Sequence, residues 1–174
     1  MAMKLSRFGF ALAACFVLAA CASGPKFSEV SSTLSKPPAG DGRIYIYRTQ
    51  TMEGAAVQPT IDIGGQKAGA CAPNGVSIAD VPAGSYDATA QTEAESKVHF
   101  SIDAGEEKYI HCYITIGFFV GHPNLDLIDA AQGRTDVQDL SFTGQRVLSF
   151  TGQASVAAPA PTPAPATDSR APTS

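Results

Sequence analysis

The sequence predicts an all-β domain, folded as a single antiparallel β-sandwich of about seven or eight strands. Between residues 43 and 142, short apolar stretches alternate with Gly, Pro, Asn and Asp. Several stretches also alternate apolar and polar residues one by one, which places successive side chains on opposite faces of a strand. No segment sustains the 3.6-residue pattern of a long helix. Short strands divided by frequent turn signals are typical of immunoglobulin-like or transthyretin-like sandwiches.

The first three predicted strands lie at 43–48, 60–63 and 66–70. The first reads Arg-Ile-Tyr-Ile-Tyr-Arg and is bulky on both faces, so we expect it in the centre of a sheet. The second and third form a hairpin across Gly64-Gly65, because glycine adopts the positive φ angles of a two-residue turn without steric cost.

The remaining predicted strands continue the alternation of apolar and polar residues. Two of them, 97–103 and 109–116, are joined by residues 104–106, which suit a short hairpin loop. The others lie around Val76 and Ile78 and at residues 86–91, 125–128 and 137–142.

Both ends of the chain differ in composition from this domain, which we place at 43–142. Residues 22–42 are rich in Ser, Pro and Gly, and with Cys21 we expect them to form a flexible tether. The spacing of Phe27, Val30 and Leu34 also allows one helical turn there. Residues 154–174 contain five prolines and seven alanines. Such a segment cannot bury enough apolar surface to offset its ordering entropy, so we predict a disordered tail.

A six-residue motif, Leu-Ser-Phe-Thr-Gly-Gln, occurs at 140–145 and again at 148–153. Two copies do not make a solenoid, which needs about three repeats. We therefore predict that residues 143–153 either extend the last strand or hang loosely from it.

The N-terminus predicts a signal peptide over residues 1–20. Lys4 and Arg7 form a basic start, and residues 8–18 form an uncharged apolar run. A helix over that run would be about 16 Å long, half of a bilayer core of about 30 Å, and so too short to span it. The pattern is that of a secretory signal.

The end of this segment, Leu18-Ala19-Ala20-Cys21, resembles the lipobox of bacterial lipoproteins. The resemblance implies cleavage between Ala20 and Cys21, a diacylglyceryl thioether on the Cys21 sulfur and acylation of the new amino group by a chain such as palmitate. The alternatives are an ordinary secretory signal or a buried N-terminal helix. An Ala rather than an Asp at position 22 implies sorting to the periplasmic face of the outer membrane. The lipid on Cys21 is then the only covalent group expected, with no other cofactor.

Composition and motifs argue against several functions. The net charge of −4 excludes nucleic acid as an expected partner, because phosphate contacts need clustered Lys and Arg. The sequence has no phosphate-cradling loop, dinucleotide fingerprint, nucleophile elbow or zinc-protease motif. We therefore expect a protein that is not an enzyme.

Five stretches, in this order behind a lipobox, carry a family resemblance. They are Gly42-Arg-Ile-Tyr-Ile-Tyr-Arg48, the strand turn Ile63-Gly-Gly65, Val81-Pro-Ala-Gly-Ser-Tyr86, Gly105-Glu-Glu-Lys-Tyr-Ile110 and the segment 125–140. The region from Gly42 to about Phe142 resembles the Domain of Unknown Function 2846 family of bacterial envelope lipoproteins. The resemblance implies a compact β-sandwich and assigns no catalytic residue.

Two cysteines, Cys71 and Cys112, remain once the signal peptide and Cys21 are set aside. An even pair in an oxidising periplasm favours a disulfide that closes a long loop. Pairing across Gly64-Gly65 would nevertheless turn Cys71 away from the core, while Cys112 faces inward. The bridge therefore requires a bulge near Gly69 or a strand end at Cys71; the alternative is two separate buried thiols.

His99 and His111 are weak candidates for a metal site. A three-residue loop at 104–106 would place them directly opposite each other on the outer face, within reach of one divalent ion such as zinc. No third ligand is evident from spacing, so no metal is predicted, and the alternative is two solvated surface histidines.

The segment Gly117-Phe-Phe-Val-Gly121 is the most apolar loop-like stretch. It is either the end of a core strand or an exposed patch for a partner. The function we expect is that of a lipid-anchored structural or interaction module that contacts an unidentified envelope protein. The alternative is a periplasmic small-ligand or metal-binding lipoprotein, which would use the His99/His111 face or the Phe118–Val120 loop.

Overall fold

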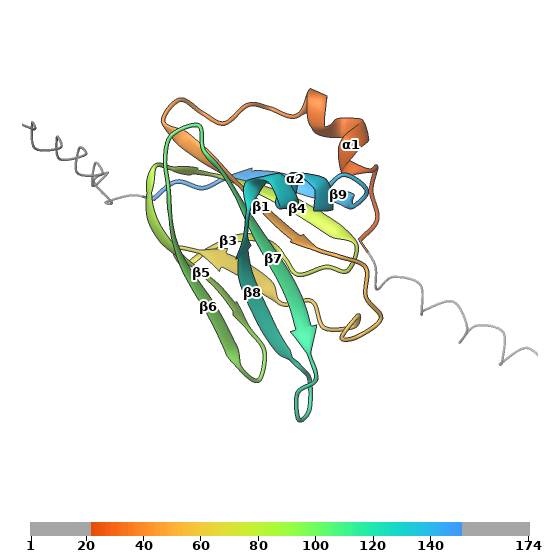
Figure 1. Cartoon of the computed structure of the whole chain (residues 1–174). Coiled ribbons are helices and arrows are strands. Elements are labelled where there is room, and N and C mark those ends of the chain that lie inside the picture. Colours follow the sequence, from red (N-terminus) through yellow and green to blue (C-terminus); the bar gives the residue numbers. More distant parts are fainter. Residues whose placement is uncertain (1–21, 151–174) are drawn as a thin grey trace, which may run out of the picture.

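The computed structural model describes residues 22–150, which form two β-sheets packed face to face with two short helices outside them (Figure 1). The five-stranded sheet has the order β8-β7-β1-β4-β9 and the four-stranded sheet the order β3-β2-β5-β6. The strands are β1 (Asp41–Arg48), β2 (Thr60–Ile63), β3 (Gln66–Ala70), β4 (Gly75–Pro82), β5 (Gly84–Gln91), β6 (Glu95–Ile102), β7 (Glu107–Thr115), β8 (His122–Ile128) and β9 (Ser141–Val147). The predicted all-β sandwich is confirmed, with β1 in the centre of its sheet.

The sequence predicted a purely antiparallel sandwich, but two of the strand pairs are parallel. β1 pairs with β7 in parallel, and β4 pairs with β9 in parallel. The predicted hairpin between 97–103 and 109–116 is wrong, because β6 pairs only with β5 while β7 pairs with β1 and β8. The chain crosses from one sheet to the other through residues 103–106. A crossover and a hairpin both need a short polar turn with glycine, so the turn chemistry alone could not separate them.

The main core lies between the sheets and a smaller one lies outside the five-stranded sheet. Along β1, Ile44 and Ile46 face the four-stranded sheet and are fully buried. Tyr45 and Tyr47 alternate with them and face the opposite way, where the helices and Phe27 cover them. The alternation of period two thus places apolar side chains in two separate cores, which is why both faces of β1 are bulky.

Residues 22–42 are not the flexible tether that their composition predicted. They contain α1 (Phe27–Val30) and η1 (Ser31–Thr33), and they pack on the five-stranded sheet. The Phe27 amide donates to the Leu140 carbonyl at 2.8 Å, and the Phe27 ring is buried against Tyr45. One large aromatic side chain and a few backbone hydrogen bonds dock a segment whose overall composition resembles a linker.

A helix, α2 (Ala130–Asp136), and a shifted last strand replace the predicted strand at 137–142. The helix begins at Asp129, whose carboxylate accepts the Ala131 amide at 2.8 Å. It packs so closely on Tyr109 that only glycine fits at Gly133. Seven residues are too few to show a helical period, which is why no helix was expected there.

The first copy of the repeated motif lies mostly in β9, and the start of the second copy packs on the domain. Leu148 is buried in the main core, and the Phe150 ring lies 5.0 Å from the Tyr86 ring. Within the predicted segment 143–153, residues 143–147 belong to β9 and residues 148–150 pack on the domain, while 151–153 lie outside the described residues. The predicted signal peptide, its cleavage after Ala20, the acylated Cys21 and the 154–174 tail lie outside the described residues. Between residues 22 and 150, no helix is both long and apolar enough to cross a membrane.

Candidate functional site

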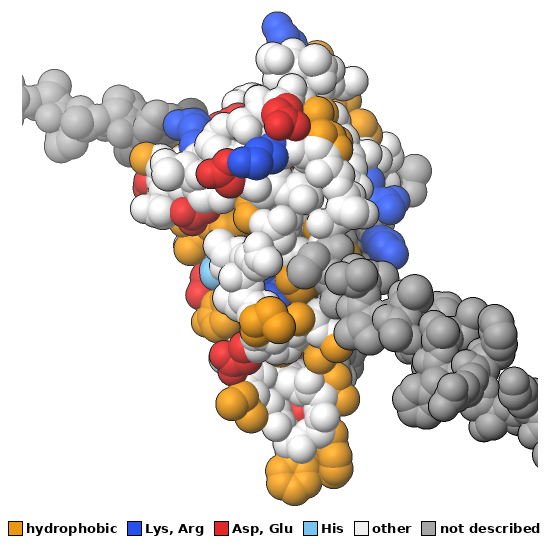
Figure 2. Space-filling model, turned by 90° about the vertical axis from the view of Figure 1, so that its right-hand side faces the viewer, with side chains coloured by type: hydrophobic (Ala, Val, Ile, Leu, Met, Phe, Trp, Pro, Cys, Tyr) orange, Lys and Arg blue, Asp and Glu red, His pale blue; other side chains and the backbone are white. Residues whose placement is uncertain are grey.

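The most exposed apolar feature of the structure is the hairpin tip, residues 116–121, which joins β7 to β8. Ile116, Phe118 and Phe119 are each at least 85% exposed, and Val120 is 53% exposed. Figure 2 shows hydrophobic side chains at the lower extremity of the molecule, where this hairpin projects. Of the two alternatives for this segment, the structure shows the exposed patch and not the end of a core strand.

The hairpin tip is held in shape by a carboxylate from the turn between β5 and β6. Glu93 accepts the backbone amide of Phe119 at 3.0 Å and that of Gly121 at 3.2 Å. The hydroxyl of Thr92 donates to the Gly121 carbonyl at 2.6 Å. Gly121 has a φ of +112°, which favours glycine. The apolar side chains therefore project from an ordered loop.

Glu93 is also the acidic group closest to the tip. Its partial burial opposes ionisation, but the amides of Gly121, Phe119 and Val120, together with the charge of His122, lower its pKa. His122 Nε2 lies 3.4 Å from the Glu93 carboxylate. The charge is thus directed at backbone amides and away from solvent.

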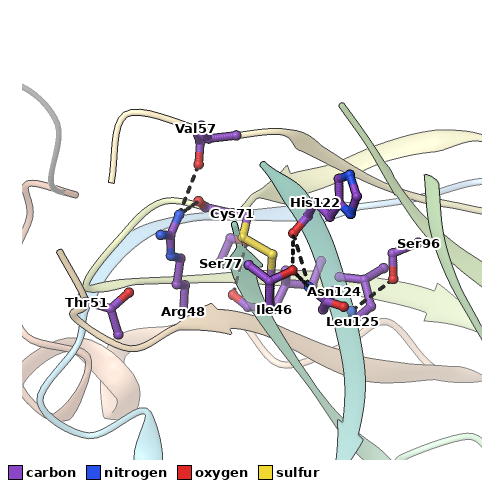
Figure 3. Close-up of a disulfide and its surroundings, with 12 residues drawn as sticks. Ile46, Arg48, Thr51, Val57, Cys71, Ser77, Ser96, His122, Asn124 and Leu125 are labelled. Atoms are coloured by element: carbon purple, nitrogen blue, oxygen red, sulfur yellow. Dashed lines mark hydrogen bonds between the residues drawn. A yellow bond between two sulfur atoms is a disulfide. The ribbon is translucent and has the colours of Figure 1, made fainter. Parts of the chain in front are cut away.

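A buried arginine organises the loop beside the hairpin. Arg48 is 1% exposed and donates to the carbonyl of Glu53 at 2.7 Å. It also donates to the carbonyls of Val57 at 3.0 Å and Cys71 at 3.3 Å (Figure 3). Burial lowers the pKa of Arg48. These hydrogen bonds fix loop 49–59 to the end of β1, and the loop carries Met52, whose side chain is 89% exposed.

The disulfide joins the two sheets close to this arginine. Cys71, directly after β3, is bonded to Cys112 of β7, with Cα atoms 5.8 Å apart (Figure 3). The sequence analysis required either a bulge or a strand end for this bridge, and the structure has both. The β2–β3 register shifts at Ile61/Asp62, and β3 ends at Ala70. The bulge and the strand end together turn the Cys71 side chain into the core, where it is fully buried.

The described chain starts at the same end of the sandwich. The Ala22 amide donates to the Pro73 carbonyl at 2.9 Å, and the β4 residue Gly75 pairs with Arg48 at the end of β1. We call this the hairpin end; it comprises Ala22, loop 49–59, turns 71–74 and 91–95, and the hairpin tip.

The two histidines proposed as a weak metal pair lie on opposite sides of the molecule. His99 projects from the four-stranded sheet and contacts Asp87, with His99 Nδ1 2.9 Å from the carboxylate. His111 lies on the outer face of the five-stranded sheet between the rings of Tyr47 and Tyr113, and burial lowers its pKa. The predicted pairing was wrong because the two strands belong to different sheets. Within residues 22–150, no group of three or more His, Cys, Asp or Glu side chains could hold a metal ion.

A cavity of about 200 Å³ opens on the outer face of the five-stranded sheet, between α1 and α2. Its charged groups already have partners within the chain. The Glu107 carboxylate accepts from Tyr45 at 3.0 Å, from Tyr109 at 3.3 Å and from Arg134 at 3.0 Å. Arg43 pairs with the fully buried Asp80 at 2.7 Å. The Arg134 contact holds α2 on the sheet, and all three charged groups of the cavity are paired within the chain.

Sequence reasoning missed Glu93, Thr92 and the role of Arg48. Glu93 sits in a polar turn more than twenty residues from the amides it accepts, and nothing local to Gln-Thr-Glu-Ala-Glu-Ser marks it. The sequence does contain an indication that Arg48 is buried. The same alternation that turns Ile44 and Ile46 inward also turns Arg48 inward, and a buried arginine needs acceptors.

Comparison with known proteins agrees with the family resemblance. A family model described as "Protein of unknown function (DUF2846)" matches residues 38–122, which run from the start of β1 through the hairpin tip. Residues 38–122 therefore form a DUF2846 region of this chain. An uncharacterized protein of Haemophilus influenzae is 27% identical over 131 residues, covering 72% of this chain and 77% of that protein. No solved structure matches the chain.

Proposed function

We propose that this DUF2846 protein is a lipid-anchored, non-enzymatic module of the cell envelope, sited at the periplasmic face of the outer membrane. Its sandwich presents the hairpin end to another component of the envelope. The observation that carries the proposal is the ordered hairpin tip, on which Phe118 and Phe119 stay exposed while Glu93 fixes the loop beneath them.

An ordered apolar surface is suited to binding. Large exposed apolar groups in a soluble domain mark contact sites more often than isolated surface residues do. Aromatic side chains bury large areas on contact and have few torsions to immobilise. Because Glu93 and Thr92 already order the loop, little further conformational entropy is lost when the tip binds.

The anchor rests on the lipobox at the end of the predicted signal peptide. Its test is metabolic labelling of cells with radioactive palmitate, combined with flotation of membranes. We expect the wild-type chain to be labelled and to float with membranes, and the Cys21→Ser chain to lose both properties. Cys15→Ser is the matched control, because Cys15 lies inside the predicted signal peptide and should leave labelling unchanged. Undiminished labelling of Cys21→Ser would overturn the anchor.

The role of the tip is tested by photo-crosslinking in intact cells. A photoreactive phenylalanine analogue replaces Phe119 in one chain and Val147 in another; Val147 is also exposed but lies in β9, where it pairs with Asp80 at the far end of the sandwich. We expect covalent adducts with another envelope component from position 119 and none from position 147. Equal crosslinking from both positions, or none from 119, would contradict a contact through the tip.

A further inference from the structure

We infer that the hairpin tip is a second membrane contact, which inserts into the lipid leaflet that holds the acyl chains of Cys21. The inference rests on the proposed function and names the component that the tip contacts. It is carried by the position of Ala22, the direction of the hairpin and the chemistry of the tip.

The docked N-terminal segment leaves almost no reach between anchor and domain. Cys21 is covalently next to Ala22, and the Ala22 amide is hydrogen-bonded to Pro73. Residues 22–34 continue along the five-stranded sheet, with Phe27 buried. An acylated Cys21 would therefore hold the hairpin end at the lipid surface.

The hairpin points in the direction of this anchor. β7 runs parallel to β1, with Tyr47 opposite His111, so β7 passes the level of Arg48 and Gly75 near Cys112. From there to Phe118 the hairpin extends roughly 20 Å, at about 3.3 Å per residue. In Figure 1 the described chain begins at the right, loop 49–59 projects on that side, and the β7–β8 tip lies at the bottom. A membrane surface that touches Ala22 and the tip would thus face the loop that bears Met52.

The tip has the chemistry of a segment that enters lipid. Residues 109–125 contain no Asp, Glu, Lys or Arg. Backbone amides that enter a bilayer must already have hydrogen-bond partners, and Glu93 supplies them for Phe119 and Gly121. Loop 49–59 and turns 71–74 and 91–95 also lack Lys and Arg, and their charged residues are Glu53, Glu93 and Glu95. Binding should therefore depend on apolar burial and not on anionic lipid.

Lipid fits this tip better than a protein surface does. A stable protein interface uses about 20–30 residues on each side, whereas the tip offers four apolar side chains on a projecting ribbon. Lipid needs no complementary shape and accepts a small convex probe. A contact of this size is weak alone, but acyl chains and an inserted loop together give the two signals that stable membrane binding requires.

The chain contains no tryptophan, so a single introduced indole reports on its own position. The lipidated Phe118→Trp chain is reconstituted into phosphatidylcholine vesicles, with and without brominated acyl chains. We expect a blue-shifted indole emission and strong quenching by the brominated lipid. The lipidated Val147→Trp chain is the matched control, and its emission should be neither shifted nor quenched.

Two results would overturn the inference while leaving the anchor intact. One is a Phe118→Trp chain that floats with vesicles but is not quenched by brominated lipid. The other is an emission already blue-shifted without vesicles, in a chain that sediments as a dimer, because a second copy then covers the tip. Failure of the lipidated chain to float would instead count against the anchor.

A second measurement tests the hairpin tip in a chain that carries no acyl lipid at position 21. The Cys21→Ser chain should bind phosphatidylcholine vesicles weakly, and binding should be no stronger when a quarter of the lipid is phosphatidylglycerol. Replacing both Phe118 and Phe119 by Ser should lower the partition coefficient by at least about tenfold, from the apolar area lost. Val147→Ser should leave it unchanged. Binding that survives Phe118→Ser/Phe119→Ser, or that requires the anionic lipid, would refute insertion of the tip.

Discussion

At the scale of single residues, several charged side chains of this domain bind backbone groups or buried side chains of opposite charge. Arg48 donates to three carbonyls and fixes loop 49–59, and Glu93 accepts two amides of the hairpin tip. Arg43 forms a buried ion pair with Asp80. Buried charges are tolerated only with such partners, so each of them imposes one local conformation on the chain around it.

The first prediction concerns protonation of Glu93. Its pKa is lower in the folded chain than in the unfolded one, so its contribution to stability is complete above about pH 4.5 and is lost as the pH falls through the lowered value. In an NMR titration from pH 6 to pH 3, the amide signals of Phe119 and Gly121 should shift together as the Glu93 carboxylate is protonated. In Glu93→Gln this step should be absent. An identical titration in both chains would contradict the capping role.

The second prediction concerns the buried ion pair. Arg43→Met leaves the Asp80 carboxylate in a fully buried site without its cation, and should lower the free energy of unfolding by about 3–5 kcal/mol. Arg43→Met/Asp80→Leu should recover most of that loss, because no buried charge remains. Urea denaturation measures both. The exposed pair of Lys26 with Asp139 provides a control, since Lys26→Met should leave the midpoint unchanged.

At the scale of secondary-structure elements, two devices tie together segments that lie far apart in the sequence. The disulfide joins the end of β3 to β7 across the core, and α1 docks the start of the domain against the segment before β9. The Ser96 hydroxyl also accepts the Leu125 amide at 3.1 Å, which links β6 to β8 across the edges of the two sheets (Figure 3). The disulfide and the Ser96 hydrogen bond lie next to turns 71–74 and 91–95 and restrain these two parts of the hairpin end.

The third prediction concerns the disulfide. It closes a loop of 41 residues, which in the chain-entropy model stabilises the folded state by about 4 kcal/mol. Reductant should therefore lower the urea midpoint of the Cys21→Ser chain markedly. The further Cys71→Ala/Cys112→Ala chain should match the reduced protein and should not respond to reductant. Equal midpoints with and without reductant would show that the bridge adds no stability.

The fourth prediction concerns the docked N-terminal segment. Phe27→Ala removes a ring that is 5% exposed and packs on Tyr45, a change that typically costs about 3–5 kcal/mol when the site cannot collapse. We expect the segment to detach locally, so that the amides of Ala22 and Phe27 lose protection in hydrogen exchange. Amides in the centre of β1 should keep theirs. Continued protection of the Ala22 amide would contradict docking through Phe27.

At the scale of the whole molecule, the proposed function depends on two contacts made by one rigid body. The anchor and the tip reinforce each other only if the domain between them keeps its orientation. The sheet register places the tip at the hairpin end and the docked segment places Ala22 there, whereas Val147 lies at the opposite end.

The fifth prediction tests this coupling in the lipidated chain. Inserting twenty Gly and Ser residues between Ala22 and Ser23 adds a flexible span of about 25 Å and frees the domain from its anchor. Flotation should be unchanged, but quenching of the Phe118→Trp indole by brominated lipid should fall, because the effective concentration of the tip at the surface falls. Undiminished quenching would show that the docked segment does not orient the domain.

Local patterns determined much of this protein. The strands at 60–63, 66–70 and 86–91 followed from alternation and glycine turns, and β1 lies in the centre of its sheet as its two bulky faces predicted. The apolar segment 117–121 was recognised as the most unusual loop, although the sequence left open whether it was buried. These features depend on neighbours along the chain, which is why sequence alone could reach them.

Tertiary structure decided which sheet each strand joins, and with that the site. The sequence could not show that β6 and β7 separate into different sheets, which removed the histidine pair and left His111 between two tyrosine rings. It could not show that Glu93 caps a loop more than twenty residues away, or that Phe27 converts an apparent tether into a docked segment. The physical reason is that turn and strand propensities are local, whereas pairing, burial and capping depend on contacts between residues distant in the sequence.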